Sequence, residues 1–305
     1  MSTRVLDSDA IEELLAAFPG RAGIVVKDLL TGTAFTHNAD ERFPVASVIK
    51  LPIMVELYRQ IDAGRISLDQ RLCLHDGICR FGTGRICTGS VEEFTILELC
   101  HLMIADSDDV ATDLVTEAIG LDQVNQTMAD LGFRDTSVPM SMGRWHYTMA
   151  GMADVEINPE NDAIVAQDIA AGRIDLEGLP FSASLDNNVS SARDMARMLE
   201  QIDAGELISA AASAAMLKML HACEHRGMIP RDLDADIAIA HKIGQSTGIR
   251  ADVGIVYGPK PGRLVASLRP VVIAALTRAP EPGTARPGKD LIARIAKHVC
   301  SSGSG

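Results

Sequence analysis

Strand-forming stretches occupy both ends of this 305-residue chain, and helix-forming stretches occupy its middle. The strand patterns near the start lie at residues 23–29 and, after a turn at Thr31-Gly32, in a short run through Phe35. Those near the end lie at residues 237–242, 251–257 and 264–276. The first two runs are typical of a hairpin. We therefore expect an α/β (α+β) fold in which both ends of the chain build one antiparallel sheet, flanked by the first and last helices.

The helical middle predicts how the chain divides. Apolar residues recur at helical spacing in the segments 9–20, 47–63, 94–105, 109–119, 121–131, 191–204, 209–221 and 289–298. Residues 1–55 and 225–300 would form a discontinuous sheet domain, and residues 56–224 an inserted all-α lobe. Residues 301–305 resemble a flexible tail or a remnant of cloning. Residues 143–188 are acidic and lack clear periodicity, which predicts a long functional loop.

The composition excludes several classes of function. Lys and Arg number 28 against 41 Asp and Glu, which gives a net charge of −13. A surface this acidic repels phosphate backbones and anionic lipid headgroups. Aromatic residues make up only 4% of the chain, which leaves few platforms for stacking bases. We therefore expect no nucleic-acid partner and no membrane partner.

The N-terminal stretch and the cysteines predict the compartment. Asp7, Asp9, Glu12 and Glu13 lie where a secretion signal needs an unbroken apolar core. The six cysteines contain no C-x-x-C pair, so the signatures of zinc ribbons and thioredoxins are missing. We expect a soluble cytoplasmic protein with reduced thiols, without a metal or a cofactor.

Three short motifs carry chemical groups, in the order Ser47-Val48-Ile49-Lys50, Ser107-Asp108-Asp109 and Lys242-Ile243-Gly244. Residues three apart on a helix share a face, so the Lys50 amine lies within reach of the Ser47 hydroxyl. The start of a helix favours negative charge on the serine oxygen, and a partly buried lysine can accept a serine proton. Each motif also has a purely structural interpretation: the serines cap helices, and Lys242 extends from a strand end into solvent.

In this order and spacing, the motifs resemble the S-x-x-K, S-D-N and K-T-G signatures of the class A β-lactamases and penicillin-recognising serine hydrolases. The longer stretches that resemble this family are residues 43–52, 82–84, 106–113, 241–244 and 252–256. The resemblance implies a class A β-lactamase-like fold and a reaction through an acyl-enzyme.

The resemblance also implies a role for each motif residue. Ser47 would be the acylated nucleophile, Lys50 its activating amine, and Ser107 the relay of a proton to the leaving group. Lys242 would hold Ser107 and the negative end of the substrate. The backbone N–H groups of Ser47 and Gln245 would form the oxyanion hole. The implied catalytic residues are Ser47, Lys50 and Ser107, and the implied substrate-binding residues are Asp109, Lys242, Gly244 and Gln245.

Three departures from the family pattern bear on the activity. Asp109 stands where the family has asparagine, and an ionised carboxylate donates no hydrogen bond. Ile243 and Gln245 replace the hydroxyl and the small residue that usually follow the lysine. The deacylating glutamate of the E-x-x-L-N signature is missing, although Glu156 and Glu160 lie in the corresponding stretch.

These observations leave three functions open. The first is a serine hydrolase or acyltransferase that acts on a small amide, lactam or ester. The second is a true β-lactamase whose glutamate lies within residues 143–188. The third is a catalytically silent protein that binds a small molecule or peptide in the same cleft. The aromatic cluster Trp145-His146-Tyr147 either lines the pocket or packs the loop.

Overall fold

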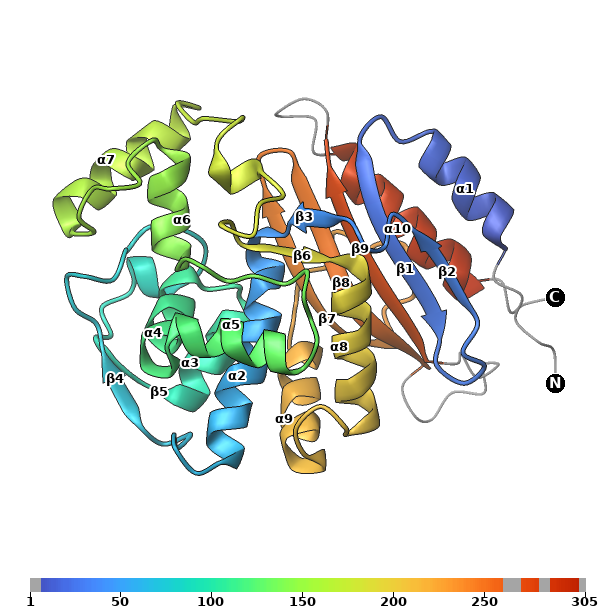
Figure 1. Cartoon of the computed structure of the whole chain (residues 1–305), viewed down its shortest axis with the longest axis horizontal. Coiled ribbons are helices and arrows are strands. Elements are labelled where there is room, and N and C mark those ends of the chain that lie inside the picture. Colours follow the sequence, from blue (N-terminus) through green and yellow to red (C-terminus); the bar gives the residue numbers. More distant parts are fainter. Residues whose placement is uncertain (1–6, 260–269, 280–285, 302–305) are drawn as a thin grey trace.

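The computed structural model describes residues 7–259, 270–279 and 286–301. Its main sheet has five strands in the order β2-β1-β9-β8-β7, and every neighbouring pair is antiparallel (Figure 1). The strands are β1 Arg21–Asp28, β2 Ala34–His37, β7 Ile237–Ser246, β8 Ile249–Pro259 and β9 Val271–Arg278. Because β1 pairs with β9, the two ends of the chain meet in the centre of the sheet, which confirms the predicted fold.

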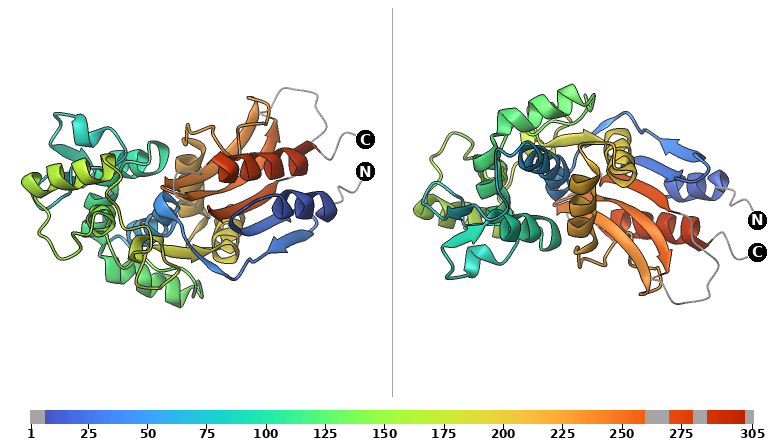
Figure 2. Two further views of the ribbon diagram at one scale, coloured as in Figure 1. Left: turned by 90° about the horizontal axis from the view of Figure 1, so that it is seen from above. Right: turned by 90° about the horizontal axis from the view of Figure 1, so that it is seen from below.

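Helices cover both faces of the sheet (Figure 2). The helices α1 Ser8–Ala16 and α10 Arg286–Ser301 lie on one face, and α8 Ala192–Ala204 and α9 Ala210–His221 lie on the other. Alternate residues of β9 enter two different cores: Val272 and Ala274 pack on the α8 side, and Ile273 and Ala275 pack on the α10 side. This period of two explains why a central strand reads as an unbroken apolar run.

A central helix joins the sheet to the helical lobe. The 3-10 turn η1 Ala46–Ile49 leads into α2 Lys50–Asp62, and most of α2 is buried, Glu56 and Gln60 included. A helix buried on nearly all sides is a core element. Around it lie α3 Ile96–Ala105, α4 Asp109–Ile119, α5 Leu121–Asp130, α6 Met142–Met149 and α7 Pro159–Ala170. The short elements are β3 Arg42–Pro44, β4 Arg71–Cys73, β5 Glu93–Thr95, β6 Val189–Ser191, η2 Ile86–Thr88 and η3 Leu179–Phe181.

The prediction of an unstructured segment at residues 143–188 is wrong, because this segment contains most of α6 and all of α7. Ser141 caps α6, and Asn158 caps α7 with Pro159 in its first turn. Much of α7 is exposed, Ile164 included, so its apolar residues do not repeat at helical spacing. Helix caps were therefore the better signal here.

The helices α8 and α9 belong by sequence to the predicted lobe of residues 56–224, and they pack against the sheet. The proposed domain bounds stay a prediction. The first part of the strand pattern at 264–276 and the tail residues 302–305 lie outside the described residues.

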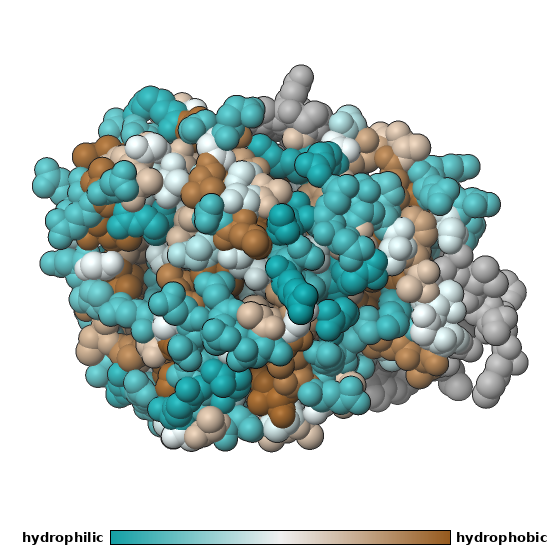
Figure 3. Space-filling model, in the orientation of Figure 1, coloured by the Kyte–Doolittle hydropathy of each residue, from teal (hydrophilic) through white to brown (hydrophobic). Residues whose placement is uncertain are grey.

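The surface is predominantly polar. On the face drawn in Figure 3, hydrophilic side chains dominate and apolar ones form small separate groups. The large apolar side chains that are exposed, such as Leu30, Val91 and Leu185, are far apart in the sequence. In the described part of the chain, no helix has both the length and the apolar character needed to cross a membrane.

Candidate active site

Ser47 lies at the junction of the sheet and the lobe, in the η1 turn that precedes α2. Ala46, directly before it, has a φ of 45°, a left-handed conformation that is strained for a residue with a side chain. The edge strand β7 contacts this turn. A Cβ atom at Gly244 would lie 2.1 Å from the carbonyl oxygen of Val45 and 3.2 Å from the Ser47 nitrogen. Only glycine therefore lets β7 approach the serine this closely.

Lys50 is fully buried directly behind Ser47. Its amine donates to the Ser107 carbonyl oxygen at 2.7 Å, to Ser107 Oγ at 3.4 Å and to Asp109 Oδ1 at 2.6 Å. These three bonds match the three donors of an ammonium group. Among the described residues the expected hydrogen bond between Lys50 Nζ and Ser47 Oγ is not formed. The amine is instead drawn to a buried carboxylate, the stronger partner.

Asp109 is buried, and its carboxylate is bonded to three residues of the protein. Besides Lys50, it accepts from the Thr83 backbone nitrogen at 2.8 Å and pairs with His146 Nε2 at 3.1 Å, both through Oδ2. Burial raises the pKa of Asp109, but the Lys50 charge and the His146 hydrogen bond outweigh it and hold this pKa well below its usual range. A Cβ atom at Gly82 would lie 2.4 Å from Oδ2, so the loop closes tightly over the carboxylate. The aspartate therefore serves as an internal counter-ion.

Ser107 links the two lysines. Its Oγ accepts a 2.9 Å hydrogen bond from Lys242 Nζ as well as the longer one from Lys50. Its φ of 58° turns the backbone so that the carbonyl oxygen also faces Lys50. Burial and the nearby Lys50 charge lower the pKa of Lys242 to about 7. Near neutral pH, Lys242 can therefore exchange a proton with Ser107.

These groups open onto one cavity of about 280 Å³. Its wall includes Ser47, Ser107, Lys242 and Gln245 from the sequence prediction, together with Thr83, Ala105, Asp106, Cys223, Glu224, His225 and Ile243. Lys50 and Asp109 lie behind this wall rather than in it, as far as the described residues show. The substrate contact expected for Asp109 stays a prediction; within the described residues, its carboxylate contacts Lys50, Thr83 and His146.

The segment 143–188 places a histidine, rather than the expected glutamate, beside the site. Glu156 and Glu160 are exposed on the surface. Trp145 is buried against Phe181, with ring centroids 6.5 Å apart. Within the described residues, His146 is the side chain of this segment that hydrogen-bonds a predicted site residue, Asp109. The E-x-x-L-N pattern could not indicate this histidine, because its first position admits only a carboxylate.

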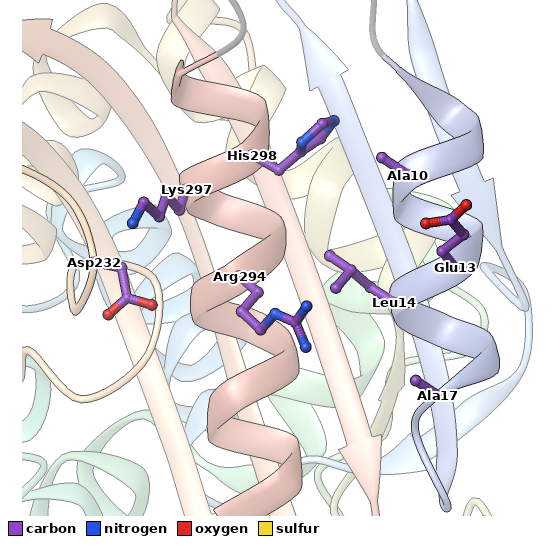
Figure 4. A pocket seen from close by; sticks show the side chains of 8 residues that line it. All are labelled: Ala10, Glu13, Leu14, Ala17, Asp232, Arg294, Lys297 and His298. Atoms are coloured by element: carbon purple, nitrogen blue, oxygen red, sulfur yellow. The ribbon is translucent and has the colours of Figure 1, made fainter.

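A larger cavity lies away from this site. It has a volume of about 740 Å³ and is open between α1 and α10, on the opposite face of the sheet from α8 (Figure 4). Its described lining is Ala10, Glu13, Leu14, Ala17, Asp232, Arg294, Lys297 and His298, which contains no serine or cysteine nucleophile. The smaller cavity is thus the one with a nucleophile and proton-transfer groups.

In fold and sequence, the chain is similar to the serine enzymes that act on β-lactams. The chain belongs to the β-lactamase enzyme family, whose model matches residues 8–302. It is 24% identical over 299 residues to the β-lactamase AER-1 of Aeromonas hydrophila, covering 96% of this chain and 87% of that protein.

Three further proteins broaden this comparison. The β-lactamase regulatory protein BlaB of Streptomyces cacaoi is 26% identical over 295 residues, with 90% of each chain covered. The crystal structure of a β-lactamase from Sphaerobacter thermophilus has a TM-score of 0.76 and 25% identity, and covers 97% of this chain and 98% of that one. The structure of PBP-A shares the fold, with a TM-score of 0.75 and 23% identity. The match covers 97% of this chain and 94% of that one.

Proposed function

We propose that the protein is a serine hydrolase or acyltransferase that forms an acyl-enzyme at Ser47 with a small lactam, amide or ester. One observation carries this proposal: a single cavity is lined by a serine hydroxyl, a second serine and a lysine whose pKa is near 7. The first serine supplies the nucleophile, and the other two supply a path for its proton.

In this proposal the proton travels from Ser47 to Ser107 and on to Lys242. The hydroxyl of Ser107 accepts the proton of Ser47 as its own proton passes to the neutral Lys242 amine, 2.9 Å away. Lys50, paired with Asp109, fixes the backbone and the hydroxyl of Ser107 by hydrogen bonds. On collapse of the tetrahedral intermediate, Ser107 returns the proton to the leaving group. The backbone N–H groups of Ser47 and Gln245 hold the oxyanion.

We further propose that the second step, attack of water on the acyl-enzyme, is slow. The low pKa of Asp109 makes it a poor base, and Glu156 and Glu160 are exposed. A true β-lactamase with its glutamate in residues 143–188 is therefore the weaker proposal. The free thiols of Cys73, Cys79, Cys87, Cys100 and Cys223 suit a reducing compartment, so we propose a cytoplasmic location.

A second candidate is a silent binding protein that uses the same cavity. It is favoured by the missing Ser47–Lys50 hydrogen bond and by the relative whose name is that of a regulatory protein. This candidate predicts reversible binding without a covalent bond.

Stopped-flow kinetics with a chromogenic ester separate these proposals. Slow deacylation predicts a burst of product equal to the enzyme concentration, followed by a slow phase that an added amine or alcohol accelerates. A missing general base costs about 10²–10⁴-fold in a proton-transfer step, enough to make deacylation limiting. Steady turnover without a burst, insensitive to the added nucleophile, would contradict slow deacylation, and loss of that turnover in Glu156→Gln would identify a lactamase base. Absence of all product would favour the silent binder.

A further inference from the structure

A second nucleophile lines the cavity of Ser47. Cys223 follows the last turn of α9, is half-buried, and belongs to the same wall as Ser107 and Lys242. None of the steps proposed for Ser47 uses this thiol. Its surroundings are those of an activated cysteine rather than of a structural one.

The group behind Cys223 is His241, buried on β7. His241 Nδ1 lies 2.9 Å from Asp252 Oδ1 on β8, and Asp252 Oδ2 accepts the backbone N–H of Ile229 at 2.9 Å. Both oxygens of this carboxylate are therefore fixed by hydrogen bonds, and the carboxylate holds the imidazole through Nδ1. A Cβ atom at Gly254 would lie 2.4 Å from the Cβ of His241, so glycine at 254 makes room for the ring.

Charge favours the thiolate form of Cys223. Burial opposes a charge on His241, but the Asp252 carboxylate and the Cys223 sulfur outweigh it and raise the pKa of His241 to about 10. Burial raises the pKa of Cys223, but hydrogen bonds from His241 and from the His225 backbone, with the positive charges of His241 and Lys242, lower it below its ordinary value.

Other groups facing the sulfur act against this effect. Asp106 and Glu224 line the same cavity, and the carbonyl end of α9 adds a partial negative charge. The Asp106 carboxylate is paired with Arg85 at 2.7 Å, and Glu224 is exposed. Solvent and the ion pair weaken both charges, whereas His241 and Lys242 act on the sulfur from the buried side.

We propose that Cys223, held by His241 and Asp252, is a reactive thiolate site for small disulfides, and that its modification closes the cavity to the substrate of Ser47. The second clause rests on the function proposed above. The thiolate attacks one sulfur of the disulfide, a new S–S bond forms at Cys223, and the old S–S bond breaks. The released thiolate takes a proton from solvent, and an added thiol reverses the reaction.

The size of the cavity explains the closure. Its 280 Å³ equals the liquid volume of about nine water molecules, at about 30 Å³ each. An aromatic group linked to Cys223 would occupy much of this space, next to Ser47 and Lys242. A mixed disulfide would also remove a negative charge that favours the ammonium form of Lys242.

The reactivity is tested with dithiodipyridine at pH 6, with peptide mapping of each thiol over time. Cys73, exposed on β4, is the reference within the same molecule. We expect Cys223 to react at least tenfold faster than Cys73, and its alkylation by iodoacetamide to shift to higher pH in His241→Gln. Equal or slower reaction of Cys223, or an unshifted pH profile in the variant, would overturn the site.

The closure is tested by labelling Ser47 with a fluorescent penicillin before and after dithiodipyridine treatment. Labelling should fall in proportion to the modified fraction of Cys223 and recover with dithiothreitol, whereas Cys223→Ala should keep its own labelling rate after treatment. Unchanged labelling of the modified wild type would overturn the closure. Absence of labelling in the untreated protein would overturn the function proposed above and the closure with it, while the reaction rates still decide the Cys223 site.

Discussion

Replacing Asp109 with asparagine restores the residue usual in the resembled family and removes a buried counter-ion. The Lys50–Asp109 pair is 2.6 Å apart, with 0% and 3% of the two side chains exposed. An asparagine oxygen can still accept from Lys50, but its NH₂ group then faces a fixed donor, the backbone N–H of Thr83. In the reverse orientation the NH₂ group faces Lys50. Either orientation brings donor against donor in a buried site.

The expected loss of stability follows from this geometry. Removing one partner of a buried ion pair typically costs about 3–5 kcal/mol. At about 2.1 cal/mol/K per residue, the 305-residue chain has an unfolding entropy of about 0.64 kcal/mol/K. The Asp109→Asn variant should therefore melt about 5–8 °C lower than the wild type at pH 7.

The matched control is Asp106→Asn, in the same loop. Asp106 pairs with Arg85, whose side chain is 71% exposed, and such pairs contribute at most about 1 kcal/mol. Differential scanning calorimetry of both variants gives the comparison. The control should melt within about 1–2 °C of the wild type. If Asp109→Asn also melts within this range, the buried ion pair does not stabilise the protein by the expected amount.

Three further predictions concern single groups. The rate at which a neutral ester acylates Ser47 should rise with pH through about 7, because Lys242 must lose its proton to act as a base. In Lys242→Arg, pH–rate profiles should show no such rise and a rate about 10²–10⁴-fold lower. Gly244→Ala should lower the rate of Ser47 labelling about 100-fold, which is the effect of displacing a reacting group by about 1 Å. The control Gly89→Ala, where the nearest contact of the added Cβ atom is at 3.3 Å, should leave this rate unchanged. The raised pKa of His241 stabilises the fold fully below pH 6.5 and less as the pH rises toward 10. The melting temperature should therefore fall over this pH range, and fall less steeply in His241→Gln. If the melting temperatures of the two proteins fall equally steeply with pH, the raised pKa of His241 is contradicted.

Much of the fold could be predicted because its signals are local. The helix predicted at residues 109–119 matches α4, where the cap Asp108 precedes a strongly amphipathic pattern. The hairpin of β1 and β2 follows from two short runs around a glycine turn. The helix α7 was missed because much of its surface is exposed, so packing left little periodicity in its sequence.

The candidate site could be predicted only where a motif lies within one stretch of sequence. Ser47, Ser107 and Lys242 came from three such motifs, and the structure brings all three to one cavity. The direction of the Lys50 amine depends on a partner 59 positions away, Asp109, which no local pattern reveals.

The Cys223 site depends on the pairing of two strands. His241 lies opposite Gly254, which places Asp252 two residues away on the same face of the sheet. The thiol comes from a third stretch, after α9. Spacing within the sequence gives no sign of this arrangement, because strand register decides which side chains meet.

The covalent adduct at Ser47 is the most direct test of the proposed function. The protein is incubated with a fluorescent penicillin and, separately, with an activated ester, and then examined by intact-protein mass spectrometry and peptide mapping. Acylation of Ser47 should give one adduct per chain, on the peptide that contains Ser47, and none on that peptide in Ser47→Ala. A wild-type protein that binds these compounds without any adduct at Ser47, or a Ser47→Ala variant that turns over the ester at the wild-type rate, would contradict it.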